Sequence, residues 1–187
     1  NTLASIDHLI ETDPARASQM QKNLIALLRA SMPTMREAAG GSGNGVRDLG
    51  RELAVIRPYL EILKVRMEER LQTEIDVPEG LMSAEFPPMM IQTLVENAIK
   101  HGLEPKPGGG TIWILARRHD DHATLTVADD GQGFGGQSTG TGIGLKNLRE
   151  RLRLTFGSEA SFAIVSNFPS GVAATLTLPL DGKAGAA

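Results

Sequence analysis

Residues 89–102 read MMIQTLVENAIKHG, and this stretch predicts the helix from which the rest of the fold can be placed. Its apolar residues recur at i, i+3, i+4 and i+7, as on a helix face that packs against a core: Ile91, Leu94, Val95 and Ala98. Its polar residues gather on another side: Thr93, Glu96, Asn97, Lys100 and His101. Two interpretations are open here. Such a face is usually solvated surface, but a carboxylate beside an amide oxygen also suits Mg²⁺, and a lysine one turn later would meet phosphate as a point charge.

The strand predicted at residues 124–129, TLTVAD, ends in an acidic residue that faces the core. By strand parity Leu125, Val127 and Asp129 point to the same side. Burial of a lone carboxylate is costly unless hydrogen-bond donors surround it. The glycines that follow, in DDGQGFGG at residues 129–136, let a backbone approach a flat ligand closely. The pattern predicts an acceptor at the bottom of a cleft, as the 6-amino group of adenine would require.

A second glycine cluster, GTGIGL at residues 140–145, runs into a predicted helix from Gly144 to Phe156. Free backbone N–H groups and the helix dipole make such a terminus an anion site. The first cluster formally matches the dinucleotide pattern G-x-G-x-x-G at Gly131, Gly133 and Gly136. We reject that interpretation because the pattern must turn straight from strand into helix, whereas serine, threonine and further glycines intervene here.

Hydrophobic periodicity indicates helices in the first 71 residues. One helix opens at Asp13-Pro14, an N-cap followed by a proline at the first helical position, and is expected to end near Pro33. A glycine-rich linker follows over residues 38–45. The next helix has apolar positions spaced 4, 3, 4, 3 and 4 apart: Leu49, Leu53, Ile56, Leu60, Leu63 and Met67. This spacing is typical of a coiled coil or of a bundle formed by two copies of a hairpin.

After Leu71 the period changes to two-residue alternation, and we place a domain boundary there. Strands are expected near residues 73–77, 111–118, 123–129, 162–166 and 172–178. Antiparallel strands on one side and helices on the other make the predicted fold α+β, a two-layer α/β sandwich preceded by a helical hairpin. The predicted domains are the hairpin at 1–71, the sandwich at 72–181 and a tail at 182–187.

The composition excludes several classes of protein. The 187 residues carry 19 basic and 22 acidic side chains, a formal net charge of −3, so there is no overall cationic surface for nucleic acid. The absence of cysteine excludes disulfides, thiolate metal sites and cysteine nucleophiles. The apolar runs are shorter than the roughly 18 residues of a membrane span. His119 and His122 lie three apart in a predicted turn, and without a third ligand nearby we do not expect a metal site.

Taken in order, the three motifs resemble the N, G1 and G2 boxes of the GHKL ATP-binding fold. The matching residues are Glu96-Asn97 with Lys100-His101, then Asp129-x-Gly131-x-Gly133, then Gly140-x-Gly142-x-Gly144-Leu145. More narrowly, the stretches LVENAIKHG, DDGQGF, GTGIGLKNLRERL and YLEILKVRMEERL are similar to LytS-type sensor histidine kinases. The resemblance covers almost the whole chain. It implies an enzyme that binds Mg-ATP and transfers the γ-phosphoryl group to a histidine, and then to an aspartate of a response regulator protein.

The resemblance also implies roles for single residues. Asn97 matches the asparagine that holds Mg²⁺, and Glu96 matches the acidic residue that acts as a base or orients water. Lys100 matches a phosphate contact, His101 lies at the edge of the nucleotide, and Asp129 reads adenine. Glu96 and Lys100 are the implied catalytic residues. The implied ATP-binding set also contains Gly131, Gly133, Phe134, Gly140, Thr141, Gly142, Ile143, Gly144, Leu145 and Lys146.

Two residues depart from the family pattern. Thr93 stands where many histidine kinases have an asparagine, and Val172 stands where a threonine is common.

The family's acceptor histidine lies in a segment like PHFLFNTL, which would place it just upstream of Asn1, and His8 is the alternative acceptor. We therefore expect this chain to bind ATP without phosphorylating itself.

The resemblance implies partners beyond the response regulator. These are a second copy of the protein, bound through the helical hairpin, and a membrane reached only through segments outside this chain, which would place these residues in the cytoplasm. Two alternatives stay open. One is a GHKL ATPase of the gyrase, mismatch-repair or chaperone kind, in which Glu96 activates water. The other is a dimerisation module that binds nucleotide weakly or not at all and has no catalysis.

Overall fold

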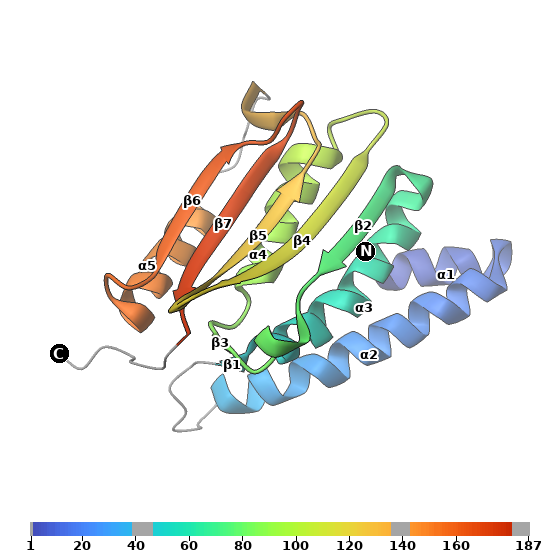
Figure 1. The fold of residues 1–187 in the computed structure, drawn as a ribbon. Coiled ribbons are helices and arrows are strands. Elements are labelled where there is room, and N and C mark those ends of the chain that lie inside the picture. Colours follow the sequence, from blue (N-terminus) through green and yellow to red (C-terminus); the bar gives the residue numbers. More distant parts are fainter. Residues whose placement is uncertain (1, 39–46, 136–142, 181–187) are drawn as a thin grey trace.

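The computed structural model describes residues 2–38, 47–135 and 143–180. Its centre is a five-stranded sheet (Figure 1) in the order β2 (Leu71–Asp76), β4 (Gly110–His119), β5 (His122–Asp129), β7 (Val172–Pro179) and β6 (Ser161–Ser166). Neighbouring strands from β4 to β6 are antiparallel, whereas β2 and β4 are parallel. The expectation of purely antiparallel strands was therefore wrong at β2. The chain leaves β2, forms a helix and returns as β4, which is the crossover that a parallel pair needs.

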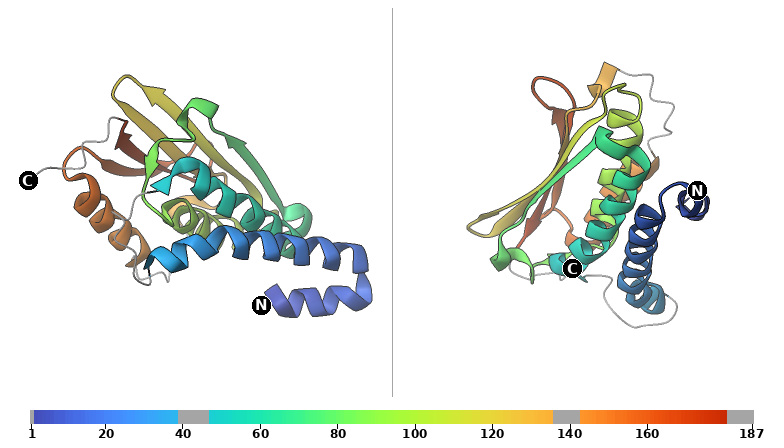
Figure 2. Two further views of the ribbon diagram at one scale, coloured as in Figure 1. Left: turned by 90° about the horizontal axis from the view of Figure 1, so that it is seen from below. Right: turned by 90° about the vertical axis from the view of Figure 1, so that its right-hand side faces the viewer.

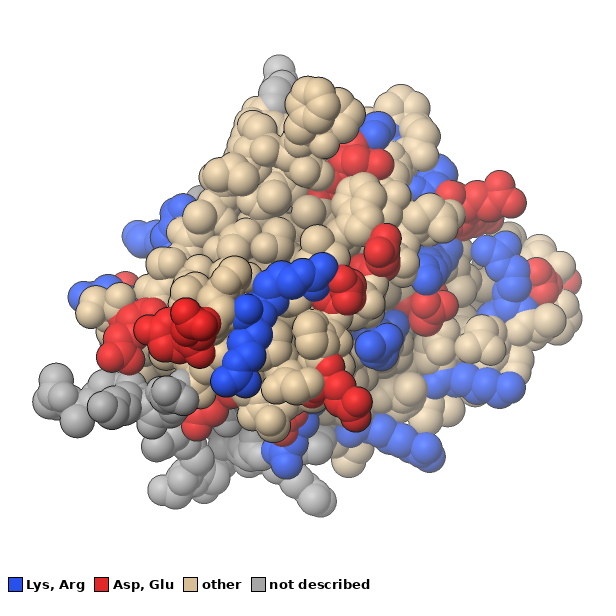
Figure 3. All heavy atoms as spheres, viewed as in Figure 1, with Lys and Arg blue, Asp and Glu red and all other residues tan. Residues whose placement is uncertain are grey.

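Helices cover one face of this sheet. Figure 1 shows α4 (Met90–Asn97) and α5 (Ile143–Phe156) behind the strands, while the opposite face is open to the viewer. In β4 the residues toward the helices are buried, with Ile112 and Ile114 at 0% exposure, and the alternating Trp113 and Leu115 are partly exposed. Few charged side chains lie on the open face over β5, β7 and β6 (Figure 3). The predicted two-layer α+β sandwich is confirmed.

Helix α3 (Leu49–Met67) belongs to the same core as the sheet. The side chain of Asp48, the N-cap residue of α3, accepts from the backbone N–H of Arg51 at 2.7 Å. All six residues of the regularly spaced apolar seam are buried in one hydrophobic cluster with the strands and with α4. This seam is therefore covered by the sheet and by α4 of the same chain, and pairing of the helical segment with a second copy stays a prediction. Spacing predicts that a face is buried but does not predict what buries it.

Helices α1 (Thr2–Thr12) and α2 (Pro14–Ala38) lie outside α3, and Figure 2 shows α2 packed along its outer side. Asp13 accepts from the backbone N–H of Arg16 at 3.1 Å, so the predicted N-cap is confirmed. The prediction that this helix ends near Pro33 was wrong, since α2 runs on to Ala38. Strong helix formers surround Pro33, and a proline inside a helix costs about 3 kcal/mol without always ending it.

Short elements complete the fold. A two-stranded sheet pairs β1 (Arg47–Asp48) with β3 (Glu85–Phe86), and single turns form η1 (Glu68–Arg70) and η2 (Glu79–Leu81). The hairpin turn between β4 and β5 and the last turn of α5 lie as predicted, and Gly157 closes α5 with a positive φ of 61°. Within the described residues, no helix combines the length and apolarity needed to cross a membrane.

Candidate nucleotide-binding site

Asp129 is a buried carboxylate and the last residue of β5, the strand whose arrowhead points upward in Figure 1. It is 3% exposed, and Leu125 and Val127 on the same side are 3% and 2% exposed, so the predicted strand parity is confirmed. The Asp129 Oδ1 accepts from the backbone N–H of Gly131 at 2.8 Å, and the backbone N–H of Val172 also donates to this carboxylate. Burial raises the pKa of Asp129, and these two donors partly oppose that shift. The carboxylate is thus fixed in direction by backbone groups.

Two glycines allow the loop after β5 to touch the end of the α4 segment. A Cβ on Gly102 would lie 2.7 Å from the Asp129 Oδ1, and a Cβ on Gly131 would lie 2.3 Å from the carbonyl carbon of Gly102. The backbone N–H of Gln132 donates to the Gly102 carbonyl at 3.0 Å, and its side chain donates to the His101 carbonyl at 3.0 Å. Gly102 is a site residue that the sequence analysis missed, because only the fold brings it against Asp129.

The predicted helix at residues 89–102 changes form halfway. After α4 the chain continues as η3 (Ala98–Leu103), a π-helical turn, with the backbone N–H of Glu104 bonded to the Ile99 carbonyl at 2.8 Å. The prediction of one regular α-helix was therefore wrong at its end. Turns of this kind occur often at functional sites. Here the turn changes the angular relation of Lys100 and His101 to Asn97.

The predicted polar site residues lie on α4 and on the η3 turn that follows it. The Asn97 side chain donates from Nδ2 to the Thr93 carbonyl at 2.9 Å, so its Oδ1 is the atom that can coordinate a cation. Glu96 is exposed and accepts from the Gln92 side chain at 2.8 Å. Lys100 is exposed and His101 is half-buried. An amide oxygen and a carboxylate are hard oxygen ligands, so this donor set fits Mg²⁺.

The first turn of α5 adjoins α4. A Cβ on Gly144 would lie 3.6 Å from the Thr93 Cγ2, which brings the predicted anion site beside the helix that carries Asn97. Lys146 is exposed in that turn, whereas Leu145 packs against the hydrophobic core. Gly140, Thr141, Gly142 and the side chain of Ile143 lie outside the described residues.

The remaining predicted residues border the Asp129 loop. Gly133 has a positive φ of 72°, a conformation that favours glycine, whereas the space is sufficient, since a Cβ there would lie 3.5 Å from the Gly171 backbone. Phe134 is 61% exposed. Tyr59, on α3, is influenced by Glu96 instead: burial and the Glu96 charge raise the pKa of Tyr59 to about 12. Neither Tyr59 nor its relation to Glu96 was predicted for the site.

Glu52 is a second buried carboxylate, and the sequence analysis missed it. It is 4% exposed on α3 and accepts from the backbone N–H of Met89 at 2.9 Å. Met89 precedes α4 with a positive φ of 64°, which is rare for a residue other than glycine. A carboxylate at this helix terminus satisfies a free N–H group and interacts favourably with the helix dipole. Glu52 therefore fixes the start of α4 to α3.

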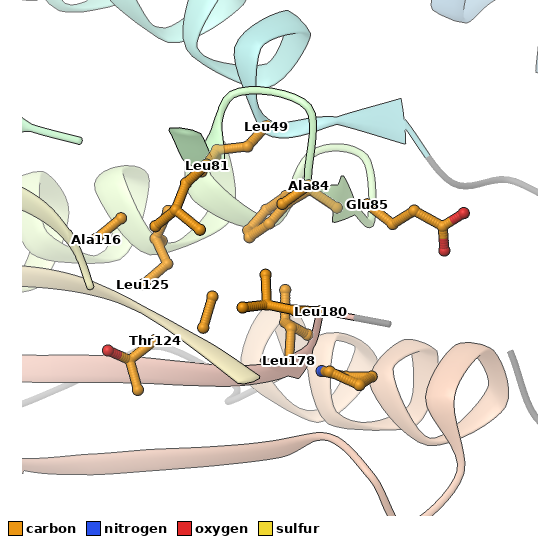
Figure 4. A pocket seen from close by; sticks show the side chains of 12 residues that line it. Leu49, Leu81, Ala84, Glu85, Ala116, Thr124, Leu125, Leu178 and Leu180 are labelled. Carbon is orange, nitrogen blue, oxygen red and sulfur yellow. The ribbon is translucent and has the colours of Figure 1, made fainter. Parts of the chain in front are cut away.

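A small apolar crevice lies at the opposite end of the sheet. Figure 4 shows leucine side chains facing into it from the segment before β3 and from the ends of β5 and β7, including Leu81, Leu125 and Leu178. It has no cationic lining, so it does not suit phosphate. His119 and His122 stack with ring centroids 4.8 Å apart, and no group of metal-ligating side chains forms in the part of the chain that the structure describes.

Comparison with known protein families agrees with this geometry. The model of the histidine kinase-, DNA gyrase B- and HSP90-like ATPases matches residues 84–182, and a histidine kinase model matches residues 1–71. Sensor histidine kinase YesM of Bacillus subtilis is 34% identical over 184 residues, covering 96% of this chain and 30% of YesM. Sensor histidine kinase BtsS of Escherichia coli is 30% identical, with 96% of this chain and 30% of BtsS covered. The chain thus spans about 30% of the length of these relatives.

Solved structures share the fold. The histidine kinase domain of a blue-light activated histidine kinase from Erythrobacter litoralis superposes with a TM-score of 0.59 at 16% identity, covering 98% of this chain and 90% of that one. The catalytic domain of histidine kinase ThkA gives a TM-score of 0.55 at 17% identity, with 72% and 94% covered. The resemblance to the GHKL fold and to LytS-type kinases is confirmed. This chain belongs to the family of histidine kinase-, DNA gyrase B- and HSP90-like ATPases.

Proposed function

We propose that this chain is the catalytic core of a sensor histidine kinase in a two-component system. It binds Mg-ATP at the end of the sheet where Asp129 lies. An imidazole nitrogen of the acceptor histidine forms a bond to the γ-phosphorus, the bond to the β–γ bridging oxygen breaks, and ADP leaves. The phosphoryl group then passes to an aspartate of a response regulator.

The geometry of Asp129 supports this function most directly. Its carboxylate is 3% exposed, yet two backbone N–H groups hold it at the border of the Gly102–Gly131 contact. A buried acceptor of fixed direction suits the 6-amino group of adenine, because a donor from the ligand offsets the cost of burying the carboxylate. A surface aspartate that only ends a strand would not need this surrounding.

Residues of α4, of the η3 turn and of the first turn of α5 would bind the triphosphate and its metal ion. Asn97 would hold Mg²⁺ through its amide oxygen, and the ion, when bound, neutralises charge on the phosphate oxygens. Lys100 binds phosphate as a point charge, and Lys146 adds a second positive charge in the first turn of α5. Glu96 orients the attacking group or accepts a proton from it. The protein's contribution is mainly positioning and electrostatic stabilisation.

The helical segment would supply the partner surface. Apolar side chains are exposed on α1 and α2: Leu3, Ile10, Ile25, Leu28 and Met32. We keep the boundary after Leu71 and propose that residues 1–71 pair with a second copy of the protein through these side chains. The acceptor histidine would lie upstream of Asn1, and a sensor that reaches the membrane would lie outside this chain.

Labelling of the full-length protein with [γ-³²P]ATP tests the proposal. We expect acid-labile, base-stable label, as for phosphohistidine, and its loss in Asn97→Ala but not in the control Asn23→Ala on α2. Release of inorganic phosphate without label would instead indicate an ATPase. Absence of both label and ATP binding would indicate a dimerisation module without catalysis.

A further inference from the structure

Three side chains from two separate segments converge on the backbone of Asp129 and Asp130. The Asn167 Nδ2 donates to the Asp129 carbonyl at 2.9 Å. The Ser170 Oγ donates to the Asp130 carbonyl at 3.0 Å, and the Lys106 Nζ donates to the same carbonyl at 2.5 Å. All three side chains are partly buried. We call them the carbonyl clamp.

The clamp acts where the sheet stops holding the chain. The ladder between β5 and β7 ends at the pair Ala128 and Ala173, so on that side the Asp129 carbonyl lies beyond the last paired residues. The Asn167 amide takes the place of the missing ladder donor. Without it, the carbonyl of the residue that carries the site's buried carboxylate would lose this bond.

The turn that carries Asn167 and Ser170 is itself fixed. The backbone N–H of Asn167 donates to the Gly171 carbonyl at 3.0 Å and closes the turn. Gly171 has a φ of 101°, and a Cβ there would lie only 1.9 Å from the Asp129 carbonyl oxygen. The turn therefore packs directly on the Asp129 backbone, and a shift of one moves the other.

The opposite side is fixed as well. The Arg70 guanidinium donates to the Lys106 carbonyl at 2.9 Å, which anchors the loop from which the Lys106 side chain reaches Asp130. The Asp130 carboxylate accepts from the backbone N–H of Thr111 at 2.7 Å and holds the start of β4. Asp130 is thus a structural neighbour of the site, and its own carboxylate is already used.

We propose that Asn167 and Ser170, together with Lys106, are positioning residues that aim the Asp129 carboxylate at the 6-amino group of the bound base. The inference rests on the proposed function and extends it to base selectivity. The clamp does not touch the nucleotide. It fixes the two peptide units that follow Asp129, from 129 to 131, and therefore the direction of the carboxylate oxygen that accepts from the base.

Base discrimination tests the clamp, using ATP and ITP as probes, since hypoxanthine has an oxygen where adenine has the 6-amino group. The double variant Asn167→Ala/Ser170→Ala should lower the ratio of the ITP Kd to the ATP Kd by about threefold to tenfold, because two hydrogen bonds that hold the Asp129–Asp130 backbone are lost. Ser170→Thr alone keeps the hydroxyl and should keep the parent ratio. Asn23→Ala on α2 is the matched control.

The outcomes separate this inference from the proposed function. If the parent chain binds no ATP, both fail. If the parent binds ATP and the folded double variant keeps the parent ratio, only the clamp is refuted. An equal weakening of ATP and ITP would mean a general structural role and would also refute it. If the double variant does not fold, Ser170→Ala against Ser170→Thr decides by the same ratio.

Discussion

Replacement of Gly102 by alanine would force a side chain against the Asp129 carboxylate. The new Cβ would lie 2.7 Å from Oδ1, about 0.7 Å short of the 3.4 Å at which ordinary van der Waals contact begins. The carboxylate cannot retreat freely, because Oδ1 already accepts from the backbone N–H of Gly131 at 2.8 Å. We expect the free energy of unfolding to fall by about 1–3 kcal/mol, from overpacking or from a lost hydrogen bond to a charged group.

Two measurements check this prediction. For a chain of this size the melting temperature of Gly102→Ala should fall by roughly 2–12 °C, and the Kd for Mg-ATP should rise at least about tenfold if realignment of the carboxylate costs 1.4 kcal/mol or more. Gly108→Ala is the matched control, because a Cβ there meets nothing within 4 Å. Equal melting temperatures and equal Kd values for Gly102→Ala and Gly108→Ala would refute this role of Gly102.

Three further predictions concern ionisable side chains that are buried or half-buried. Tyr59 is the one tyrosine of the chain, so ultraviolet absorbance should show a phenol ionising near pH 12 in the folded protein. Because the tyrosine of the unfolded chain ionises at a lower pH, the free energy of unfolding should fall as the pH rises from 10 toward 12. Ionisation of the phenol near pH 10 in the folded protein would contradict this. Burial raises the pKa of Asp129, so the folded state binds the proton of this carboxyl more tightly than the unfolded state does. The free energy of unfolding should therefore decrease as the pH rises from the ordinary aspartate pKa through the raised one. In urea unfolding, Asp129→Asn should lack this pH dependence, and an unchanged pH dependence would refute the prediction. Glu52→Ala removes the acceptor for the backbone N–H of Met89 before α4 and should lower the free energy of unfolding in urea by about 1–3 kcal/mol. Glu61→Ala, which breaks an exposed ion pair on the same helix, should lower it by less than about 1 kcal/mol. Equal losses in the two variants would count against this role of Glu52.

Local pattern was sufficient to predict several parts of the molecule. Two-residue alternation predicted that Asp129 would face the core, and the apolar spacing predicted the buried face of α4. The N-cap at Asp13 and the helix end at Gly157 follow from their own residue types. These features depend on neighbours in the sequence, so the sequence carries them directly.

Features that depend on distant contacts could not be predicted in this way. The seam of α3 was correctly expected to be buried, but its spacing does not reveal that it joins the same hydrophobic cluster as the sheet and α4. The π-helical turn after Asn97 has no local pattern that distinguishes it from α-helix. Gly102 and Asn167 look ordinary in sequence, and only the fold brings them to Asp129.

The central claim is that the Asp129 carboxylate reads the base of a nucleotide bound to this chain. Titration of the chain with ATP in the presence of Mg²⁺, repeated with Asp129→Asn and with the exposed control Asp121→Asn, tests it most directly. We predict saturable binding by the parent and by Asp121→Asn, and a Kd at least about tenfold higher for Asp129→Asn, because an amide nitrogen would face the donating 6-amino group. No saturable binding by the parent, or an equal Kd for all three proteins, would contradict it.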